Sequence, residues 1–435
     1  MTAIFAFIAF FFFAYRLIKR IGKGFPIFEL VVTLYLLQYV ITAHLEYSWN
    51  WENTMAVEES EYLLFALLAV LSFAFGLLKV KNKIEIKQFY IPSNLASKLG
   101  RALVLIGFAG DVGMIILPDT VHSILNFFTL FKTIGVYALI FSEKKLDKII
   151  IAVFTLQIAL SAILNALLIE FIVFGIFFAM FYTIKYKISN PIKYGFIVAS
   201  FLFITIYQGV KADYRKLVWE NEVSFSDKIA ILGSLISFES FSDATSSNVQ
   251  DNESLLQTIH RLNQGWQTSK VIDQVPAVVP FQNGAEFVND MISSFVPRFL
   301  WPNKRTVNDY QRFNYFTGYS LNSRTAMSIG VIGDFYINFG KIGTCLMMFV
   351  FGLSIAKLSK WFFRKFIFTN PINLIWLPFI FSYLIRPGNE FYMVVNHLIK
   401  ALVVLWFVFK VIYPKLNLMK YYWIDYYKSQ EVMIE

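Results

Sequence analysis

The chain has 435 residues, of which 57% are hydrophobic and only 16% are charged, and its mean hydropathy is +0.57. Because soluble domains carry about 25% charged residues, this composition excludes a disordered chain and argues against an ordinary cytosolic enzyme. The single cysteine, Cys345, excludes an internal disulfide framework and a cysteine-rich metal site.

A helix needs about 20 residues to span a bilayer. Apolar segments close to this length follow one another along the chain. They predict an all-α polytopic membrane protein with about 11 transmembrane helices. Eight helices lie in residues 1–209, one large loop follows at 210–328, and three helices with a tail lie in 329–435. The predicted spans are residues 3–18, 25–43, 61–79, 102–117, 122–141, 149–164, 166–184, 193–209, 331–356, 371–385 and 393–413.

Lys and Arg are concentrated in alternate connections between these spans. One set of short connections, with the C-terminal tail, holds 24 Lys and Arg, whereas the opposite short connections hold only Arg386. Since positive residues favour the cytoplasmic side, we predict an external N-terminus, an external large loop and a cytoplasmic C-terminus. The net charge of +10 is mostly this topology signal. We therefore expect contact with anionic membrane lipids and no nucleic-acid partner.

The large loop carries 11 Lys and Arg and 12 Asp and Glu, so it is nearly neutral. A loop of this length in a compact protein is usually functional. Its apolar spacing predicts three short helices. Between the second and the third we expect a connecting segment that contains prolines, which we call the crossing. The predicted helices are residues 226–241, 253–263 and 284–300, and the crossing is 271–283.

Basic residues gather at the two ends of the large loop, next to the membrane boundary. Arginine suits phosphate because its planar fork donates two hydrogen bonds at once, although snorkelling to lipid headgroups explains such residues as well. Arg386 is added to this set because it is the only Lys or Arg in the short connections predicted to be external, where positive residues are disfavoured. The candidate phosphate-binding residues are Lys211, Arg215, Arg298, Lys304, Arg305 and Arg386.

Three polar residues enter the ninth predicted span. Asp334, Asn338 and Lys341 are spaced four and three apart, so on one helix they share a face. Ionisable groups at membrane depth are costly and usually face a cavity, although an Asp334–Lys341 structural pair is an alternative. The lone histidines, His260 and His397, are expected to be hydrogen-bonded structural groups. Histidine pairs with zinc spacing and phosphate-binding glycine motifs are missing from the sequence, so we predict neither a metal nor another cofactor.

Four motifs resemble those of the Wzy-type polymerases of bacterial O-antigens, capsules and exopolysaccharides, and they occur in that family's order. The resemblance covers essentially the whole chain, and its specificity is concentrated in residues 205–345. The motifs are GVKADYRKLVW at 209–219, HRLNQGW at 260–266, PRFLWPNKR at 297–305 and GDFYINFGKIG at 333–343.

The resemblance implies a membrane-embedded glycosyltransferase in the bacterial cytoplasmic membrane. Its substrate is an oligosaccharide repeat unit on undecaprenyl pyrophosphate, and a chain-length regulator and a flippase are possible partners. A carboxylate accepts the hydroxyl proton, with Asp334 as first choice and Asp213 as second. Aromatic rings stack on sugar faces, with interfacial anchoring as the alternative. The candidate sugar-binding residues are Trp266, Trp301, Tyr319 and Tyr336.

Three other functions are compatible with this pattern. An O-antigen ligase shares the architecture and the lipid pyrophosphate chemistry. A lipid-linked oligosaccharide flippase or another transporter often shows repeated halves, and the sequence has no such repeat. The third alternative is a noncatalytic assembly scaffold, because motif residues can persist in a fold that has no activity. The gathering of polar groups at one loop and its membrane boundary favours an enzyme.

Overall fold

The computed structural model describes residues 1–49, 55–80, 91–165, 168–186, 188–219, 223–235, 253–296, 300–301, 304–307, 309–322 and 325–415. Helices dominate these residues, and the β-bridge between Ile21 and Gly24 is an isolated one. Nine helices in the described part of the chain are long and apolar enough to cross a membrane. The protein is therefore an all-α membrane protein with several spans.

The nine long helices correspond to nine of the predicted spans. Their bounds in the structure are α1 Thr2–Arg20, α2 Ile27–Leu36 with its continuation to Trp49 in α3 (Thr42–Trp49), α4 Glu59–Lys79, α5 Ser93–Ile116, α8 Lys145–Leu164, α9 Leu168–Lys185, α10 Asn190–Trp219, α17 Gly330–Phe362, and α19 Phe391–Phe407 with its continuation to Lys415 through α20 (Tyr413–Lys415).

The two other predicted spans, 122–141 and 371–385, do not form single long helices. The first is divided into α6 (Asp119–Thr129) and α7 (Phe131–Leu139), which meet at Leu130. The second consists of a 3₁₀-helical segment, Pro371–Trp376, followed by the five-residue α18 (Leu377–Phe381). Prolines at the first turns of both pieces, Pro371 and Pro378, lack the N–H that a continuous helix needs. The prediction of an uninterrupted helix is wrong for both segments.

Glycines allow the closest contact between spans, which joins α4 to α17. A Cβ atom at Gly76 would collide with the carbonyl oxygen of Phe349, and one at Gly352 would collide with that of Phe73. The two helices therefore meet backbone to backbone, as small residues permit in membrane proteins. This packing holds α17, which contains Asp334, firmly against the N-terminal half of the chain.

The large loop contains five described helices, of which three were predicted. α11 (Phe225–Leu235), α13 (Glu253–Leu262) and α15 (Ala285–Phe295) lie within the predicted segments, and residues 236–241 of the first segment lie outside the described part. α14 (Gly265–Gln274) and α16 (Tyr310–Thr317) were not predicted. The expected crossing at 271–283 is wrong at its start, because α14 continues through Gln274.

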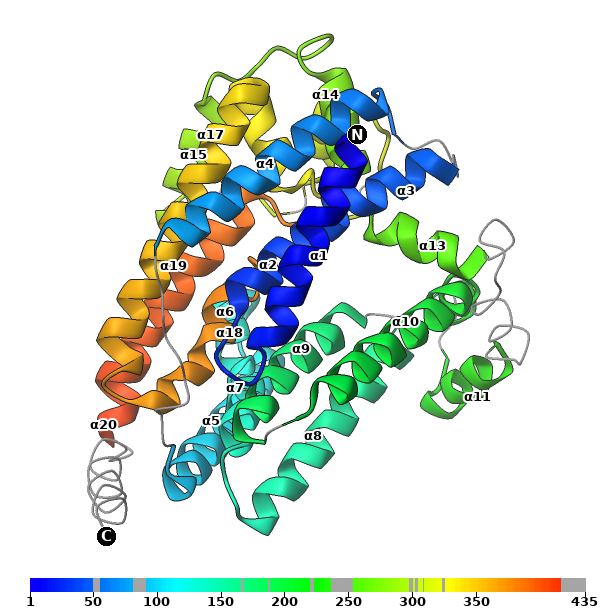
Figure 1. The fold of residues 1–435 in the computed structure, drawn as a ribbon. Coiled ribbons are helices and arrows are strands. Elements are labelled where there is room, and N and C mark those ends of the chain that lie inside the picture. The colour runs from blue at the N-terminus through cyan, green and yellow to red at the C-terminus, as the bar shows by residue number, and fades with distance from the viewer. Residues whose placement is uncertain are drawn as a thin grey trace.

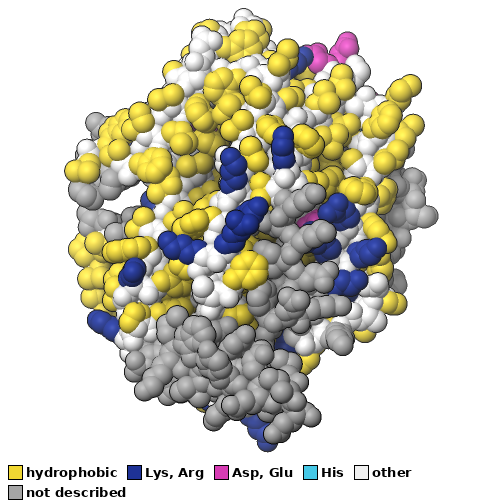
Figure 2. Space-filling view, turned by 60° about the vertical axis from the view of Figure 1, so that its left-hand side comes forward, with side chains coloured by type: hydrophobic (Ala, Val, Ile, Leu, Met, Phe, Trp, Pro, Cys, Tyr) yellow, Lys and Arg dark blue, Asp and Glu magenta, His cyan; other side chains and the backbone are white. Residues whose placement is uncertain are grey.

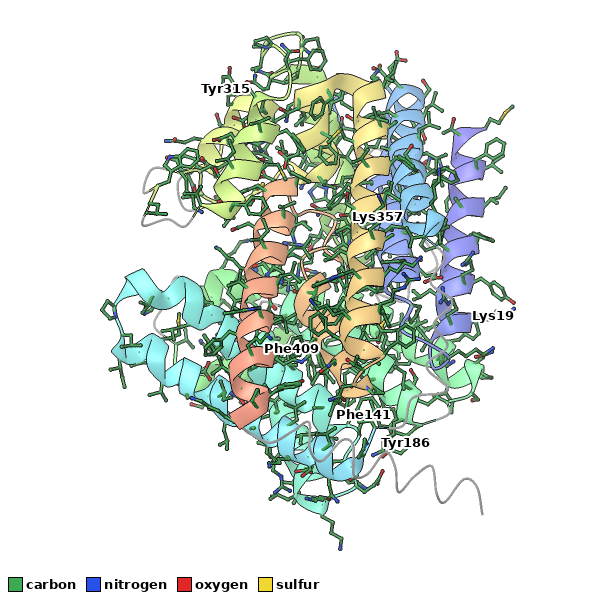
Figure 3. The ribbon with its side chains drawn as sticks, turned by 90° about the vertical axis from the view of Figure 1, so that its left-hand side faces the viewer. Lys19, Phe141, Tyr186, Tyr315, Lys357 and Phe409 are labelled. Carbon is green, nitrogen blue, oxygen red and sulfur yellow. The ribbon has the colours of Figure 1, made fainter. Side chains whose placement is uncertain are left out.

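The helices of the large loop are spread along the molecule. Figure 1 shows α14, α15 and the N-terminus toward the top, α13 and then α11 farther down on the right, and α20 at the lower left. Figure 3 shows Tyr315 of α16 at the upper end, with Lys19 and Tyr186 toward the lower end. Figure 2 shows a largely hydrophobic face on which Lys and Arg gather across the middle and lower parts. Assignment of the upper end to the outside stays a prediction.

Candidate functional site

A break within α17 separates the polar residues that the sequence placed on one face. Gly340 has φ +64°, a left-handed value that interrupts the helix. The freed carbonyl of Ile337 accepts a hydrogen bond from the Gln282 N–H at 2.8 Å. Beyond the break, Lys341 pairs with Glu61 at the surface. The prediction that Lys341 shares a face with Asp334 is therefore wrong.

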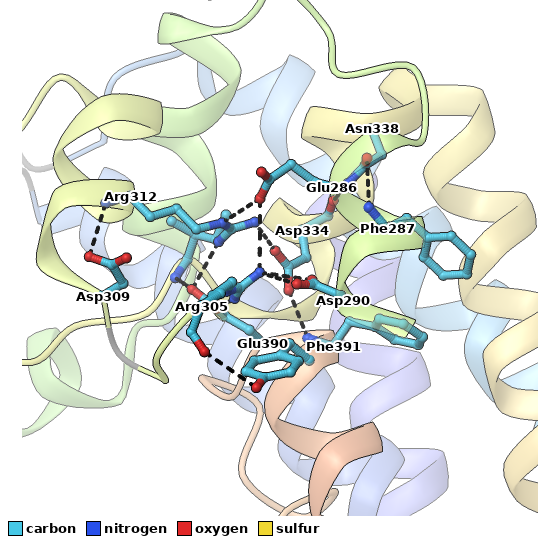
Figure 4. A network of polar contacts seen from close by, with 12 residues as sticks. Glu286, Phe287, Asp290, Arg305, Asp309, Arg312, Asp334, Asn338, Glu390 and Phe391 are labelled. Carbon is cyan, nitrogen blue, oxygen red and sulfur yellow. Dashed lines mark hydrogen bonds and ion pairs between the residues drawn. The ribbon is translucent and has the colours of Figure 1, made fainter. Parts of the chain in front are cut away.

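Asp334 belongs instead to a buried network of ionised side chains, which we call the carboxylate–guanidinium cluster (Figure 4). The network joins α15, α16, the start of α17 and the residue that precedes α19. Glu286, the most exposed member, keeps 27% of its side chain accessible. The members are Glu286, Asp290, Arg305, Arg312, Asp334 and Glu390.

Each guanidinium group of the cluster faces more than one carboxylate. Nη1 of Arg305 donates to both oxygens of Asp290, at 2.6 and 2.8 Å, while its Nη2 contacts Glu390. Arg312 donates from Nε to Glu286 at 3.0 Å and from Nη1 to Glu390 at 3.1 Å. The two arginines thus hold α15 and α16 on the membrane helices through Glu390.

The Asp334 carboxylate is fully engaged in this arrangement. Oδ1 accepts from Nη2 of Arg312, and Oδ2 accepts from the Phe391 N–H at 2.8 Å. Arg312 is oriented by its place in the first turn of α16, where the N-cap Asp309 accepts from the backbone N–H of Gln311 and of Arg312. Asp334 is only 2% exposed, so a substrate proton reaches it only if these bonds are rearranged.

The cluster holds four carboxyl groups against two guanidinium groups in a buried setting. Burial, followed by the charge of Asp334, raises the pKa of Asp290 to about 7. Burial acts to lower the pKa of Arg312, but Asp334 and Glu390 outweigh it and raise that pKa. Arg312 therefore stays charged, and the raised pKa of Asp290 favours its protonated form, which reduces the excess negative charge of the cluster.

A second charged region lies where the outer end of α10 meets α13, and it has the opposite character. Lys211 and Arg215 of α10 lie near Arg261 of α13, and we call these three residues the cation cluster. The two helices approach closely because Gly209 has no side chain to collide with Ser254. In the described part of the chain, no carboxylate lies within ion-pair distance of Lys211 or Arg261.

Mutual repulsion and burial both act on the cation cluster. Lys211 is only 8% exposed. Burial, followed by the charge of Arg261, lowers the pKa of Arg215. The Oε1 atom of Gln208, one turn before Lys211, is buried without a hydrogen-bond partner. Like charges held together, with Lys211 buried and Arg261 exposed, form a site that an anion from solvent stabilises.

A histidine–carboxylate pair lies on the same helix as Arg261. Nδ1 of His260 is 3.2 Å from Oε1 of Glu46, which is 4% exposed and projects from α3. α13 therefore bridges α3 and α10. The turn that follows is fixed by hydrogen bonds from the Gln264 N–H to the Gln38 carbonyl and from the Gly265 N–H to the Asn263 side chain, both at 2.8 Å.

Two of the four predicted sugar-binding aromatics come together. Trp266 and Tyr319 have ring centroids 5.7 Å apart, and Tyr319 is 48% exposed. Tyr336 is instead a core residue, packed between Phe65 and Phe281, whose hydroxyl donates to a backbone carbonyl. Trp301 is half-buried and has no ring contact with the other three in the described structure.

The remaining predicted site residues have structural partners. Lys304 donates to the carbonyls of Ser293 and Val296, at 2.8 and 2.7 Å, at the C-terminal end of α15. Arg386 contacts both carboxylate oxygens of Glu170, and Asp213 is exposed and 3.6 Å from Lys216. Arg298 lies outside the described residues. Of the predicted cations, the structure places only Lys211 and Arg215 in the cation cluster.

Several charged residues of these regions were missed in the sequence. Arg312 was not assigned a role, Arg261 was noticed only as part of a motif, and His260 was expected to be a structural group. A signal existed for the last two, because His260 and Arg261 lie in the last turn of a predicted amphipathic helix whose apolar face must be covered. The pairing of Glu46 with His260 joins residues 214 positions apart, and nothing local predicts it.

The fold and its charged regions define a multi-pass helical membrane protein. No group of His, Cys, Asp and Glu side chains suited to a metal ion occurs in the part that the structure describes. The chain belongs to the family described as a domain of unknown function (DUF8712), which matches residues 7–420. No match is found among curated proteins or among solved structures.

Proposed function

We propose that the protein joins undecaprenyl-pyrophosphate-linked oligosaccharide repeat units into a surface polysaccharide at the outer face of the cytoplasmic membrane. A hydroxyl oxygen of one lipid-linked unit attacks the anomeric carbon of another chain. The bond from that carbon to the pyrophosphate oxygen breaks, the lipid pyrophosphate leaves with the bonding electrons, and the hydroxyl proton passes to a base. The reaction needs no metal if protein cations stabilise the leaving group.

The cation cluster is the observation that carries this proposal. A pyrophosphate gathers negative charge as it leaves, and donors already in place stabilise that charge without reorganisation. Lys211 and Arg261 offer two such donors beside Arg215 at the end of a predicted span. The arginines of the carboxylate–guanidinium cluster fit this role poorly, since carboxylates occupy their donors.

The geometry supports His260 as the base in this mechanism better than Asp334. His260 is adjacent to Arg261 and is oriented by the Glu46 carboxylate at 3.2 Å, the arrangement by which a carboxylate fixes the tautomer of a catalytic histidine. Asp334 is buried and uses both oxygens internally. Asp213 stands two residues from Lys211, which is about 200° around the helix and so on the other side of α10.

The other groups have supporting roles in the proposed reaction. The carboxylate–guanidinium cluster fixes α15 and α16 on the membrane helices and so gives the external loop a defined position. Trp266 and Tyr319 form an aromatic surface on which a sugar ring stacks. Trp266 follows His260 and Arg261 by a short turn, so a glycan can extend from the cation cluster along that surface.

Genetic replacement tests the proposal. Deletion of the protein should leave glycans of a single repeat unit that are still transferred to the final acceptor, as seen on a polysaccharide gel. Complementation with Arg261→Gln should restore little polymer. The matched control is Lys216→Gln, which removes an exposed cation of α10 outside the cluster and should restore normal chain lengths.

Other outcomes of this experiment identify other functions. Full-length polymer that stays lipid-linked after deletion would indicate a ligase. Single units that accumulate on the inner leaflet would indicate a flippase. Normal polymer from the Arg261→Gln strain, together with polymer loss on deletion, would indicate a scaffold whose cations do not act on the substrate.

A further inference from the structure

A groove of about 530 Å³ runs along the C-terminal half of α8, where α11 lies against it. α8 lines the groove with two adjacent rows of side chains on one face: an apolar row with Leu156, Leu160 and Leu164, which we call the leucine wall, and a polar row with Gln157, Ser161 and Asn165, which we call the polar wall. Lys228 of α11 completes the lining. The groove thus has an apolar row beside a polar row, with a single cation.

The polar wall is unusual for its position. α8 is one of the candidate membrane spans, and Gln157, Ser161 and Asn165 are exposed on it. Polar side chains in a bilayer are costly unless they find hydrogen-bond partners. Asn165 donates to Ser161 at 3.3 Å, whereas the amide of Gln157 has no partner among the described residues. This wall therefore needs an occupant with hydrogen-bond acceptors.

The position of the cation sets the order of chemical groups along the groove. Leu232, four residues after Lys228, packs beside Ala162 near the C-terminal end of α8, so α11 covers that end. Gln157 lies eight residues before Asn165, about 12 Å deeper along the helix axis. The groove therefore presents a cation and an amide at its outer end, hydrogen-bond donors below them, and leucines throughout.

We propose that this groove binds an anionic glycerophospholipid. The phosphate lies at Lys228 and Asn165, the ester carbonyls accept hydrogen bonds from Ser161 and Gln157, and the acyl chains lie along the leucine wall. A helix of about 10–12 Å in diameter is too wide for a groove of this volume. A polyprenyl chain has no acceptor for Gln157. The order of groups matches a diacyl lipid instead.

The groove lies next to the proposed reaction site but is separate from it. The hydroxyls of Tyr207 and Tyr214 on α10 donate to the carbonyls of Ile163 and Leu164 at the end of α8, at 2.7 and 2.9 Å. Tyr214 immediately precedes Arg215. A lipid seated against Leu164 therefore steadies the helix segment that presents the cation cluster, and this role does not require that the protein be a polymerase.

Native mass spectrometry of the full-length protein, released from nanodiscs of equal phosphatidylglycerol and phosphatidylethanolamine, tests the headgroup assignment. Wild type should retain phosphatidylglycerol in preference. Lys228→Met should reduce that preference about fivefold, since one Lys near an anionic surface contributes about 1 kcal/mol. Lys216→Met, which removes another exposed Lys near the outer end of α10, should leave it unchanged. An unchanged preference in Lys228→Met overturns the proposal.

A second variant tests the ester contacts independently of charge. Replacement of diester by diether phosphatidylglycerol removes the acceptors of both Ser161 and Gln157 and should weaken retention by wild type about 5- to 100-fold, the effect of two lost hydrogen bonds. In Gln157→Leu the same replacement should weaken retention only about two- to tenfold, because the Ser161 bond alone is lost. Equal ester preference in both proteins overturns the assignment. Displacement of phosphatidylglycerol by undecaprenyl pyrophosphate would show that the groove holds a substrate chain instead. Loss of dimers in Gln157→Leu would show that the groove holds a second copy of the protein.

Discussion

The carboxylate–guanidinium cluster and the cation cluster both take arginines from the same large loop, yet they use them in opposite ways. In the first, Arg305 and Arg312 face four carboxyl groups within hydrogen-bond distance. In the second, Lys211 and Arg261 lie together with no carboxylate partner in the described structure. An arginine that neutralises internal charge stabilises the fold, whereas cations gathered together are available to an external anion.

This contrast predicts that matched substitutions in the two clusters have different consequences. Loss of a guanidinium group from the first cluster leaves buried carboxylates uncompensated, which is strongly destabilising. Loss of a cation from the second cluster relieves repulsion and weakens binding of an anion. Stability and affinity measured on the same variants separate the two roles.

The largest effect is expected from Arg312→Met. Because Glu286, Asp334 and Glu390 lose a shared partner, the free energy of unfolding should fall by about 3–5 kcal/mol. Denaturant unfolding of the purified protein in detergent measures this. A fall of less than about 1 kcal/mol, the range of an exposed pair, would contradict the buried network.

The next effect is expected in ligand binding by the cation cluster. Lys211→Met should weaken the binding of undecaprenyl pyrophosphate about 10- to 100-fold, because a hydrogen bond to a charged group contributes about 1.5–3 kcal/mol. The free energy of unfolding should stay equal or rise. Titration calorimetry in detergent measures the affinity, with Lys216→Met as the control. A large loss of stability with unchanged affinity would reverse the comparison between the clusters.

A smaller effect concerns the protonation of Asp290 in the carboxylate–guanidinium cluster. The folded-state pKa of Asp290 is raised to about 7, above the value near 4 of an unfolded aspartate. Its contribution is therefore fully present below pH 4 and is lost as the pH rises toward 7. The free energy of unfolding should therefore fall as the pH rises through this window.

Asp290→Asn provides the control for that pH dependence, because asparagine keeps the neutral form at every pH. The variant should show a flatter profile than wild type between pH 4 and 7. Identical profiles for the two proteins would mean that another group carries the proton.

The smallest effect is expected at an exposed ion pair, that of Lys341 with Glu61. Lys341 and Glu61 are 44% and 45% exposed, so solvent screens their attraction. Lys341→Met should change the free energy of unfolding by less than about 1 kcal/mol. A loss as large as that of Arg312→Met would show that burial does not explain the difference between the two pairs.

Most long helices were predictable because their apolar length is a local property of the sequence. α13 and α15 were predictable for a similar reason, since Leu256 and Ile259 recur at helical spacing on one face. Gly340 marked a weak point in α17, but its left-handed conformation depends on contacts with residues near Gln282 and Phe287. The local sequence contains the glycine but not the contacts that select its φ.

The candidate site was less predictable because its chemistry depends on pairings between distant residues. Arg305 looks like a free cation beside Lys304 in the sequence, and only its approach to Asp290 and to Glu390, which is 85 positions later, shows otherwise. Arg261 gained significance through its proximity to Lys211, 50 positions earlier. Charge type is visible in a sequence, whereas charge compensation is a property of the tertiary structure.

The position of Glu390 has a consequence for how the protein is made. Glu286, Asp290, Arg305 and Arg312 leave the ribosome many residues before Glu390, which accepts from both arginines. Phe391, whose N–H donates to Asp334, is translated directly after Glu390. Until the helix that begins at Phe391 is inserted, the nascent loop is joined to α17 by contacts such as that of Arg312 with Asp334, but both arginines lack their Glu390 partner. Translation of the final span is therefore the step that completes the loop, and a chain truncated before residue 390 should be recognised by quality-control proteases as unfinished.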